Sequence, residues 1–207
     1  MQEIDNGLCQ FVEQNILPLY DAFDAAHQRD HAMRVIDASL RLAQYYDVNV
    51  DMVYCSAAYH DIGLCEGREV HHIASARMMR CDQRLRRWFD EGQINTMAEA
   101  VEDHRASLAQ EPRSIYGRIV AEADRDIDPM RIIQRTIQYG MFHYPHFSRE
   151  QHWQRMFQHL HEKYAEGGYL KLWIPESKNA QNLSKLRAII ANEEQLRLIF
   201  DDYFDSL

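Results

Sequence analysis

The sequence is poor in residues that interrupt helices and in long apolar runs. Only 5 prolines and 8 glycines occur among 207 residues, and most fall where a helix would begin or end. No apolar run approaches the roughly 18 residues that a membrane-spanning helix requires. No alternation of apolar and polar residues is long enough to predict a strand. These absences argue against a membrane-spanning chain and predict an all-α fold.

Cysteine and positive charge are also scarce. The 4 cysteines form no CxxC pair, which predicts free thiols in a reducing compartment. Lys+Arg is 23 against 32 Asp+Glu, a net charge of −9 that disfavours nonspecific binding to DNA, RNA or an anionic membrane. The first residues, MQEIDNGLCQFVEQ, lack the apolar core of a signal peptide. We therefore expect a cytoplasmic protein without nucleic-acid or membrane partners.

The apolar residues recur at helical spacing. The stripe Met33, Ile36, Leu40 and Ala43 predicts a helix from about 29 to 46, and the uncharged run MVYCSAAYH predicts a buried helix that ends before Gly63. An opening helix should end near Pro18, and further helices are expected near 69–80, 82–91, 94–107, 114–124, 129–140, 148–166 and 178–206, the last broken near Asn192. We predict one helical domain over residues 1–207, with a core from about 25 to 135 and a C-terminal helical extension from about 145 to 207.

Histidine is the one residue type in clear excess, with 11 in the chain. It is a common metal ligand and titrates near neutral pH. The pair His60-Asp61 closes the buried helix, where the partial negative charge of a helix C-terminus favours a cation. A buried carboxylate is costly unless it is paired or binds a metal. The pattern predicts a metal site at this helix end, the alternative being a hydrogen-bonded His–Asp pair that caps the helix.

Three more polar residues lie on apolar helix faces, namely His71, His104 and Asp124. A lone polar group on such a face would be costly, whereas a cluster around a cation would not. We expect His71 and His104 either to join a cluster around a cation, to contact substrate, or to pack in the core.

His31, the His60-Asp61 pair and Asp124 together resemble the H…HD…D signature of the HD-domain metal-dependent phosphohydrolase superfamily. The HDIG at 60–63 and the AD at 123–124 match its usual local forms, and the resemblance covers roughly residues 25–135. The GYP motif of the cyclic-dinucleotide branch and the acidic ED pattern of the guanosine-tetraphosphate hydrolase branch are absent, which disfavours those substrates.

The resemblance implies a helical bundle that holds one or two divalent metals, drawn from Mn, Fe, Co, Zn and Mg. His31, His60, Asp61 and Asp124 would be the ligands. His71 and His104 fall where dinuclear members have two additional histidines, with His72 as the alternative to His71. No cysteine belongs to this set, which argues against a structural zinc.

The implied activity is hydrolysis of a phosphate ester or diphosphate bond in a small soluble substrate, most simply a nucleotide, with Asp61 as a catalytic residue. Positive charge and hydrogen-bond donors near the phosphoryl group are expected from His27, Arg68, Arg105 and Arg125, with Arg125 ranked first. Two alternatives stay open: a di-iron HD-fold oxygenase and a non-catalytic nucleotide-binding regulatory module. The C-terminal extension is expected either to cover the mouth of the site or to form a homodimer contact.

Overall fold

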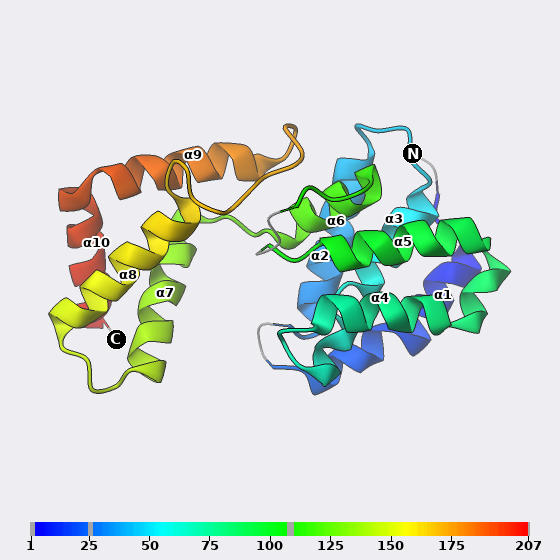
Figure 1. Ribbon diagram of the computed structural model, residues 1–207, viewed down its shortest axis with the longest axis horizontal. Coiled ribbons are helices and arrows are strands. Elements are labelled where there is room, and N and C mark those ends of the chain that lie inside the picture. The colour runs from blue at the N-terminus through cyan, green and yellow to red at the C-terminus, as the bar shows by residue number, and fades with distance from the viewer. Residues whose placement is uncertain (1–2, 25–26, 107–109, 207) are drawn as a thin grey trace. The chain divides into compact units, whose positions relative to one another are not determined.

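The protein is described by a computed structural model over residues 3–24, 27–106 and 110–206. These residues form ten α-helices and three short 3-10 helices with no strand, which confirms the all-α prediction. Within the same ranges, no helix combines the length and the apolar character needed to cross a membrane. The chain divides into two compact units, Met1–Arg125 with Trp173–Glu176, and Asp126–Leu172 with Ser177–Leu207 (Figure 1).

The first unit packs around one buried helix. Its elements are α1 (Asn6–Asn15), η1 (Leu17–Ala22), α2 (Arg29–Ala43), α3 (Val50–Tyr59), η2 (Ile62–Glu66), α4 (His71–Cys81), η3 (Gln83–Arg87), α5 (Glu91–Asp103) and α6 (Ile115–Asp124). Every residue of α3 from Met52 to Tyr59 is buried, and α2, α5 and α6 pack against this helix. From Met52 onward α3 has no charged side chain and no polar face, so this part of the helix can be buried on all sides.

Capping side chains decide where several helices begin. Asn49 accepts hydrogen bonds from the backbone N–H groups of Asp51 and Met52 at the start of α3. The predicted helix over 82–91 is wrong, because two aspartates divide this segment. Asp82 accepts from the backbone N–H of Arg84 and begins the short η3, and Asp90 forms a capping box with Gln93 that begins α5.

Gly63 lets η2 approach α4 very closely. A Cβ at this position would lie 2.4 Å from the carbonyl oxygen of His71 and 2.5 Å from the backbone nitrogen of Ser75. The backbone N–H of Gly63 donates to Ser75 Oγ at 2.8 Å. Only glycine fits this contact, which places the beginning of α4 directly beside the end of α3.

The second unit contains α7 (Pro129–His143), α8 (Arg149–Tyr164), α9 (Lys178–Ala191) and α10 (Glu193–Ser206). Pro129 stands in the first turn of α7 and the chain breaks at Asn192 between α9 and α10, as predicted. The short segment Trp173–Glu176 belongs instead to the first unit. There Ile174 is buried in an apolar cluster, and the backbone N–H of Trp173 donates to Glu122 Oε2 at 2.8 Å.

Candidate metal centre

The four predicted metal ligands and the two possible second-metal residues lie at the ends of five helices of the first unit. His31 stands in the first turn of α2, His60 and Asp61 follow α3, His71 begins α4, His104 follows α5, and Asp124 ends α6. All but His31 and Asp124 are buried. Their side chains form two groups of three in which the candidate ligand atoms lie within 4.8 Å of one another.

The first group consists of His31, His60 and Asp124. His31 Nε2 lies 3.2 Å from His60 Nε2 and 3.3 Å from Asp124 Oδ1. His60 Nε2 lies 3.8 Å from the same carboxylate oxygen.

The second group consists of Asp61, His71 and His104. The Nε2 atoms of His71 and His104 lie 3.2 Å apart, and each lies 3.4 Å from Asp61 Oδ1. The neighbouring His72 is buried but belongs to neither group. The structure therefore brings His71, rather than His72, to Asp61.

Asp61 contacts both groups with different oxygens. Its Oδ2 lies 3.4 Å from His60 Nε2 and 3.6 Å from His31 Nε2, while its Oδ1 contacts His71 and His104. A carboxylate placed in this way can bridge two cations, as in sites that hold a pair of metal ions.

The hydrogen bonds of the histidines favour a cation between them. The Nδ1–H groups of His60, His71 and His104 donate to the backbone carbonyls of Ala57, Arg68 and Val101, at 2.8, 2.7 and 2.5 Å. A carbonyl can only accept, so each Nδ1 carries a hydrogen and each ring turns its Nε2 toward the cluster. The facing lone pairs of His71 and His104 repel unless a proton or a cation lies between them. This mixed nitrogen and oxygen set fits a divalent transition metal.

Opposite charges dominate the electrostatics of the first group. Burial alone would lower the pKa of His31, but its contacts with Asp124 and Asp61 raise that pKa to about 9. Burial opposes ionisation of Asp124 too, yet His31 lowers the pKa of this carboxyl to about 2. Without a metal, His31 is therefore protonated at neutral pH, and a cation that binds to its Nε2 must displace the proton.

Tyr20 supports this site and was not identified from the sequence. It is fully buried in η1, and its hydroxyl donates to the carbonyl of Ala58 at 2.9 Å and accepts from the backbone N–H of Asp61 at 3.2 Å. In the sequence it is one aromatic residue among several, and nothing marks its hydroxyl. Tyr20 thereby fixes the turn that presents His60 and Asp61.

Replacing Tyr20 with phenylalanine should test this positioning role. Two buried backbone groups lose their partner, so we expect the free energy of unfolding to fall by about 1–3 kcal/mol. Metal affinity should fall roughly tenfold to a hundredfold, the usual effect of losing a group that orients a ligand. Calorimetric metal titration and urea unfolding would measure both.

Tyr116→Phe is the matched control for this change. The Tyr116 hydroxyl accepts from the backbone N–H of Asn49 at 3.0 Å, at the opposite end of α3. It should lose stability without losing metal affinity. Equal metal affinities in wild type and Tyr20→Phe would contradict the role of Tyr20.

The four predicted substrate-binding residues have different surroundings. His27 lies beside the cluster, with its ring 5.7 Å from that of His31 and its Nδ1 2.9 Å from Asp24 Oδ1. Arg125 is buried and donates to the carbonyl of Ala121 in its own helix. Arg105 donates to the carbonyl of Glu69 at 2.6 Å, whereas Arg68 is exposed.

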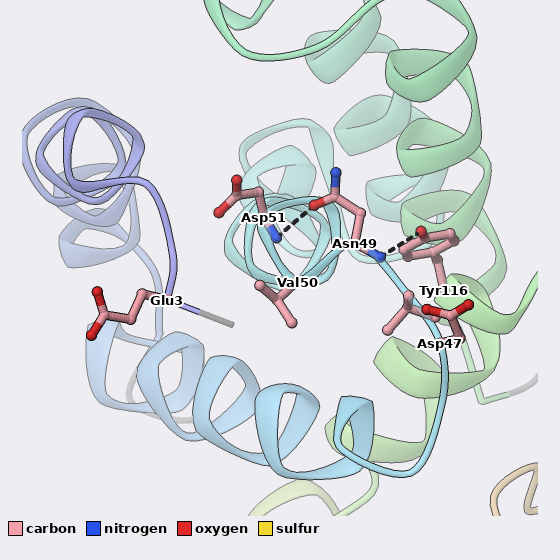
Figure 2. A pocket seen from close by; sticks show the side chains of 7 residues that line it. Glu3, Asp47, Asn49, Val50, Asp51 and Tyr116 are labelled. Carbon is pink, nitrogen blue, oxygen red and sulfur yellow. Dashed lines mark hydrogen bonds between the residues drawn. The ribbon is translucent and has the colours of Figure 1, made fainter. Parts of the chain in front are cut away.

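A pocket at the opposite end of α3 is separate from this centre. It has a volume of about 500 Å³ and is lined by Glu3, Asp47, Val48, Asn49, Val50, Asp51 and Tyr116 (Figure 2). It contains none of the predicted site residues. Because α3 runs from Val50 to Tyr59, the pocket adjoins its first turn, whereas the histidine cluster adjoins its last.

Comparison with known proteins relates this chain to others. The HD domain family matches residues 29–127, a range that contains all six residues of the two groups. A solved structure, that of a predicted HD superfamily hydrolase from an uncultured Thermotogales bacterium, aligns with a TM-score of 0.51 and 18% identity. The alignment covers 94% of this chain and 91% of that chain, and at this identity it shows a shared fold. A search of curated proteins finds no match.

Proposed function

We propose that the protein is a metal-dependent phosphohydrolase of small phosphorylated compounds, nucleotides in the first instance, because the HD domain family model matches residues 29–127. Members of this family are usually metal-dependent hydrolases. The proposal rests on one observation. The two oxygens of Asp61 face the histidines of two different groups.

The residues of the chain have distinct parts in this activity. His31, His60 and Asp124 would hold one cation, His71 and His104 a second, and Asp61 would contact both. Divalent metals supply a nucleophilic water at neutral pH and polarise a phosphoryl oxygen. His27, held by Asp24 through Nδ1, would exchange a proton with the leaving-group oxygen through its Nε2.

The same six ligands favour one second candidate, a di-iron HD-fold oxygenase. Four histidines and two carboxylates would also suit two iron ions. The two candidates differ in what the bound metal does, so metal content and oxygen consumption separate them.

Chelation provides the test of the proposed function. We expect the purified protein to release phosphate or a nucleotide from members of a panel of nucleotides and simple phosphate esters. EDTA should abolish this release, and Mn²⁺, Mg²⁺, Co²⁺, Zn²⁺ or Fe²⁺ should restore it. Release that survives complete chelation would contradict the proposal, as would a lack of release with every metal. Oxygen uptake by an iron-loaded protein that hydrolyses nothing would favour the oxygenase.

A further inference from the structure

A second pocket lies beside the metal centre without containing any of its candidate ligands. It has a volume of about 370 Å³ and is lined by Ala22, Phe23, Asp24, Leu64, Cys65 and Arg68. These residues come from the end of η1 and from η2 with the turn after it.

Two of the pocket's residues are hydrogen-bonded to residues of the centre, and a third is connected to it through His27. The carbonyl of Arg68 accepts from His71 Nδ1 at 2.7 Å, and the backbone N–H of Leu64 donates to the carbonyl of Asp61 at 3.0 Å. On the other wall, Asp24 bonds His27, whose ring contacts His31. The pocket therefore adjoins the place where chemistry would occur, but a group bound inside it is not the reacting phosphoryl group.

Arg68 differs from the other arginines near the metal centre in the contacts of its guanidinium. Across the part of the chain that the structure describes, its side chain has no hydrogen bond or ion pair. By contrast, the other arginines near the centre are engaged: Arg77 with Glu66, Arg105 with the carbonyl of Glu69, and Arg125 with the carbonyl of Ala121. An exposed guanidinium in a pocket is suited to binding a phosphate through paired N–H donors.

Two other lining residues offer apolar surface to an organic group, while Asp24 is bonded to His27. Phe23 and Leu64 are half-buried, and the Phe23 ring packs edge-on against Tyr20 at 5.7 Å. An aromatic and an aliphatic side chain beside an arginine provide surface for a base and charge for its phosphate.

We propose that this pocket binds the leaving group of the substrate, that the leaving group is a nucleotide, and that Arg68 binds its phosphate. The substrates would then be nucleoside diphosphates or dinucleotides, a class that rests on the proposed hydrolytic function. In the reaction, a water oxygen forms a bond to the attacked phosphorus and the bond from that phosphorus to the leaving oxygen breaks. The water loses a proton and the leaving oxygen gains one.

Binding to the metal-free protein tests the pocket without requiring turnover. Calorimetry in EDTA would compare the nucleoside monophosphates AMP, GMP, CMP and UMP with their nucleosides. We expect at least one monophosphate to bind, and Arg68→Gln to weaken that binding about tenfold or more while leaving the nucleoside unaffected. Arg68→Lys should recover part of the loss, because it restores the charge but not the planar guanidinium.

Arg77→Gln is the matched control, because Arg77 is also exposed but pairs with Glu66 and does not line the pocket. The absence of monophosphate binding would overturn the proposal, and so would equal binding by wild type and Arg68→Gln. Equal losses in Arg68→Gln and Arg77→Gln would also overturn it.

A kinetic comparison separates this proposal from the function on which it rests. Arg68→Gln should lower kcat/KM about tenfold or more for the nucleoside diphosphate of the base that binds best. The loss in kcat/KM for p-nitrophenyl phosphate should be much smaller, because that leaving group carries no phosphate for Arg68 to bind. Equal effects on both substrates would refute the pocket and leave hydrolysis standing. Nucleotide binding that depends on Arg68, in a protein without hydrolysis, would support the pocket and refute the function.

Discussion

Asp61→Asn is expected to lower phosphate release on the order of a thousandfold or more and to deplete bound metal at both groups. The amide has nearly the same shape as the carboxylate but lacks its charge and one acceptor oxygen. Since the two oxygens of Asp61 face different groups of histidines, a single change disturbs both. Metal content by elemental analysis and steady-state turnover are the measurements.

Asp47→Asn provides the control for this prediction. Asp47 is an exposed carboxylate in the pocket beside the first turn of α3, away from the histidine cluster. Its replacement makes the same change in charge and should leave metal content and turnover at the wild-type level. Normal metal content and turnover in Asp61→Asn would refute the bridging arrangement.

Gly63→Ala is expected to lower the free energy of unfolding by about 3 kcal/mol, at the upper end of what overpacking a core costs. The new methyl group would approach the backbone of His71 and Ser75 at 2.4 and 2.5 Å, and backbone atoms cannot rotate away as a side chain could. To relieve the contact, α4 must shift, and His71 shifts with it. We therefore expect metal binding at the second group to weaken together with stability, as measured by urea unfolding and metal titration.

Gly92→Ala serves as the comparison for this effect. A Cβ there would contact only the side chain of Asp90, at 3.2 Å, and alanine favours the helix by up to about 1 kcal/mol over glycine. This variant should be as stable as the wild type or slightly more stable. If Gly63→Ala unfolds at the same urea concentration as Gly92→Ala, the close approach of η2 and α4 does not exist in solution.

The metal centre was predictable where its signals are local. A histidine and an aspartate at the end of an apolar helix indicate a metal site from the local sequence alone. His104 and Asp124 on apolar helix faces give the same indication. The resemblance indicated His71 and His104 as a second pair but placed Asp61 with the other set, whereas the structure groups Asp61 with His71 and His104. Spacing along the chain does not say which side chains meet. His71 and His72 illustrate this point. Both are buried, and what distinguishes them is that His71 Nδ1 bonds the carbonyl of Arg68.

Long-range contacts explain the remaining differences. Tyr20 reaches Asp61 across 41 positions of the chain, so no local pattern could reveal its role. The ranking of Arg125 as the first phosphate ligand rested on its place beside Asp124. The structure shows that its guanidinium is buried and bonded to Ala121. Long, flexible side chains take their partners from the whole fold, and their sequence neighbours are a weak guide to those partners.

The crossing of Trp173–Glu176 into the first unit determines how the protein can be divided. A fragment that stops at Arg125 retains all six candidate ligands but loses Ile174, which is 1% exposed in an apolar cluster with Val53 and Ile119. It also loses the amide that donates to the buried Glu122, two residues before Asp124. Such a truncation leaves a cavity next to the helix that ends in a candidate ligand, so the first unit cannot be isolated intact simply by cutting the chain at Arg125.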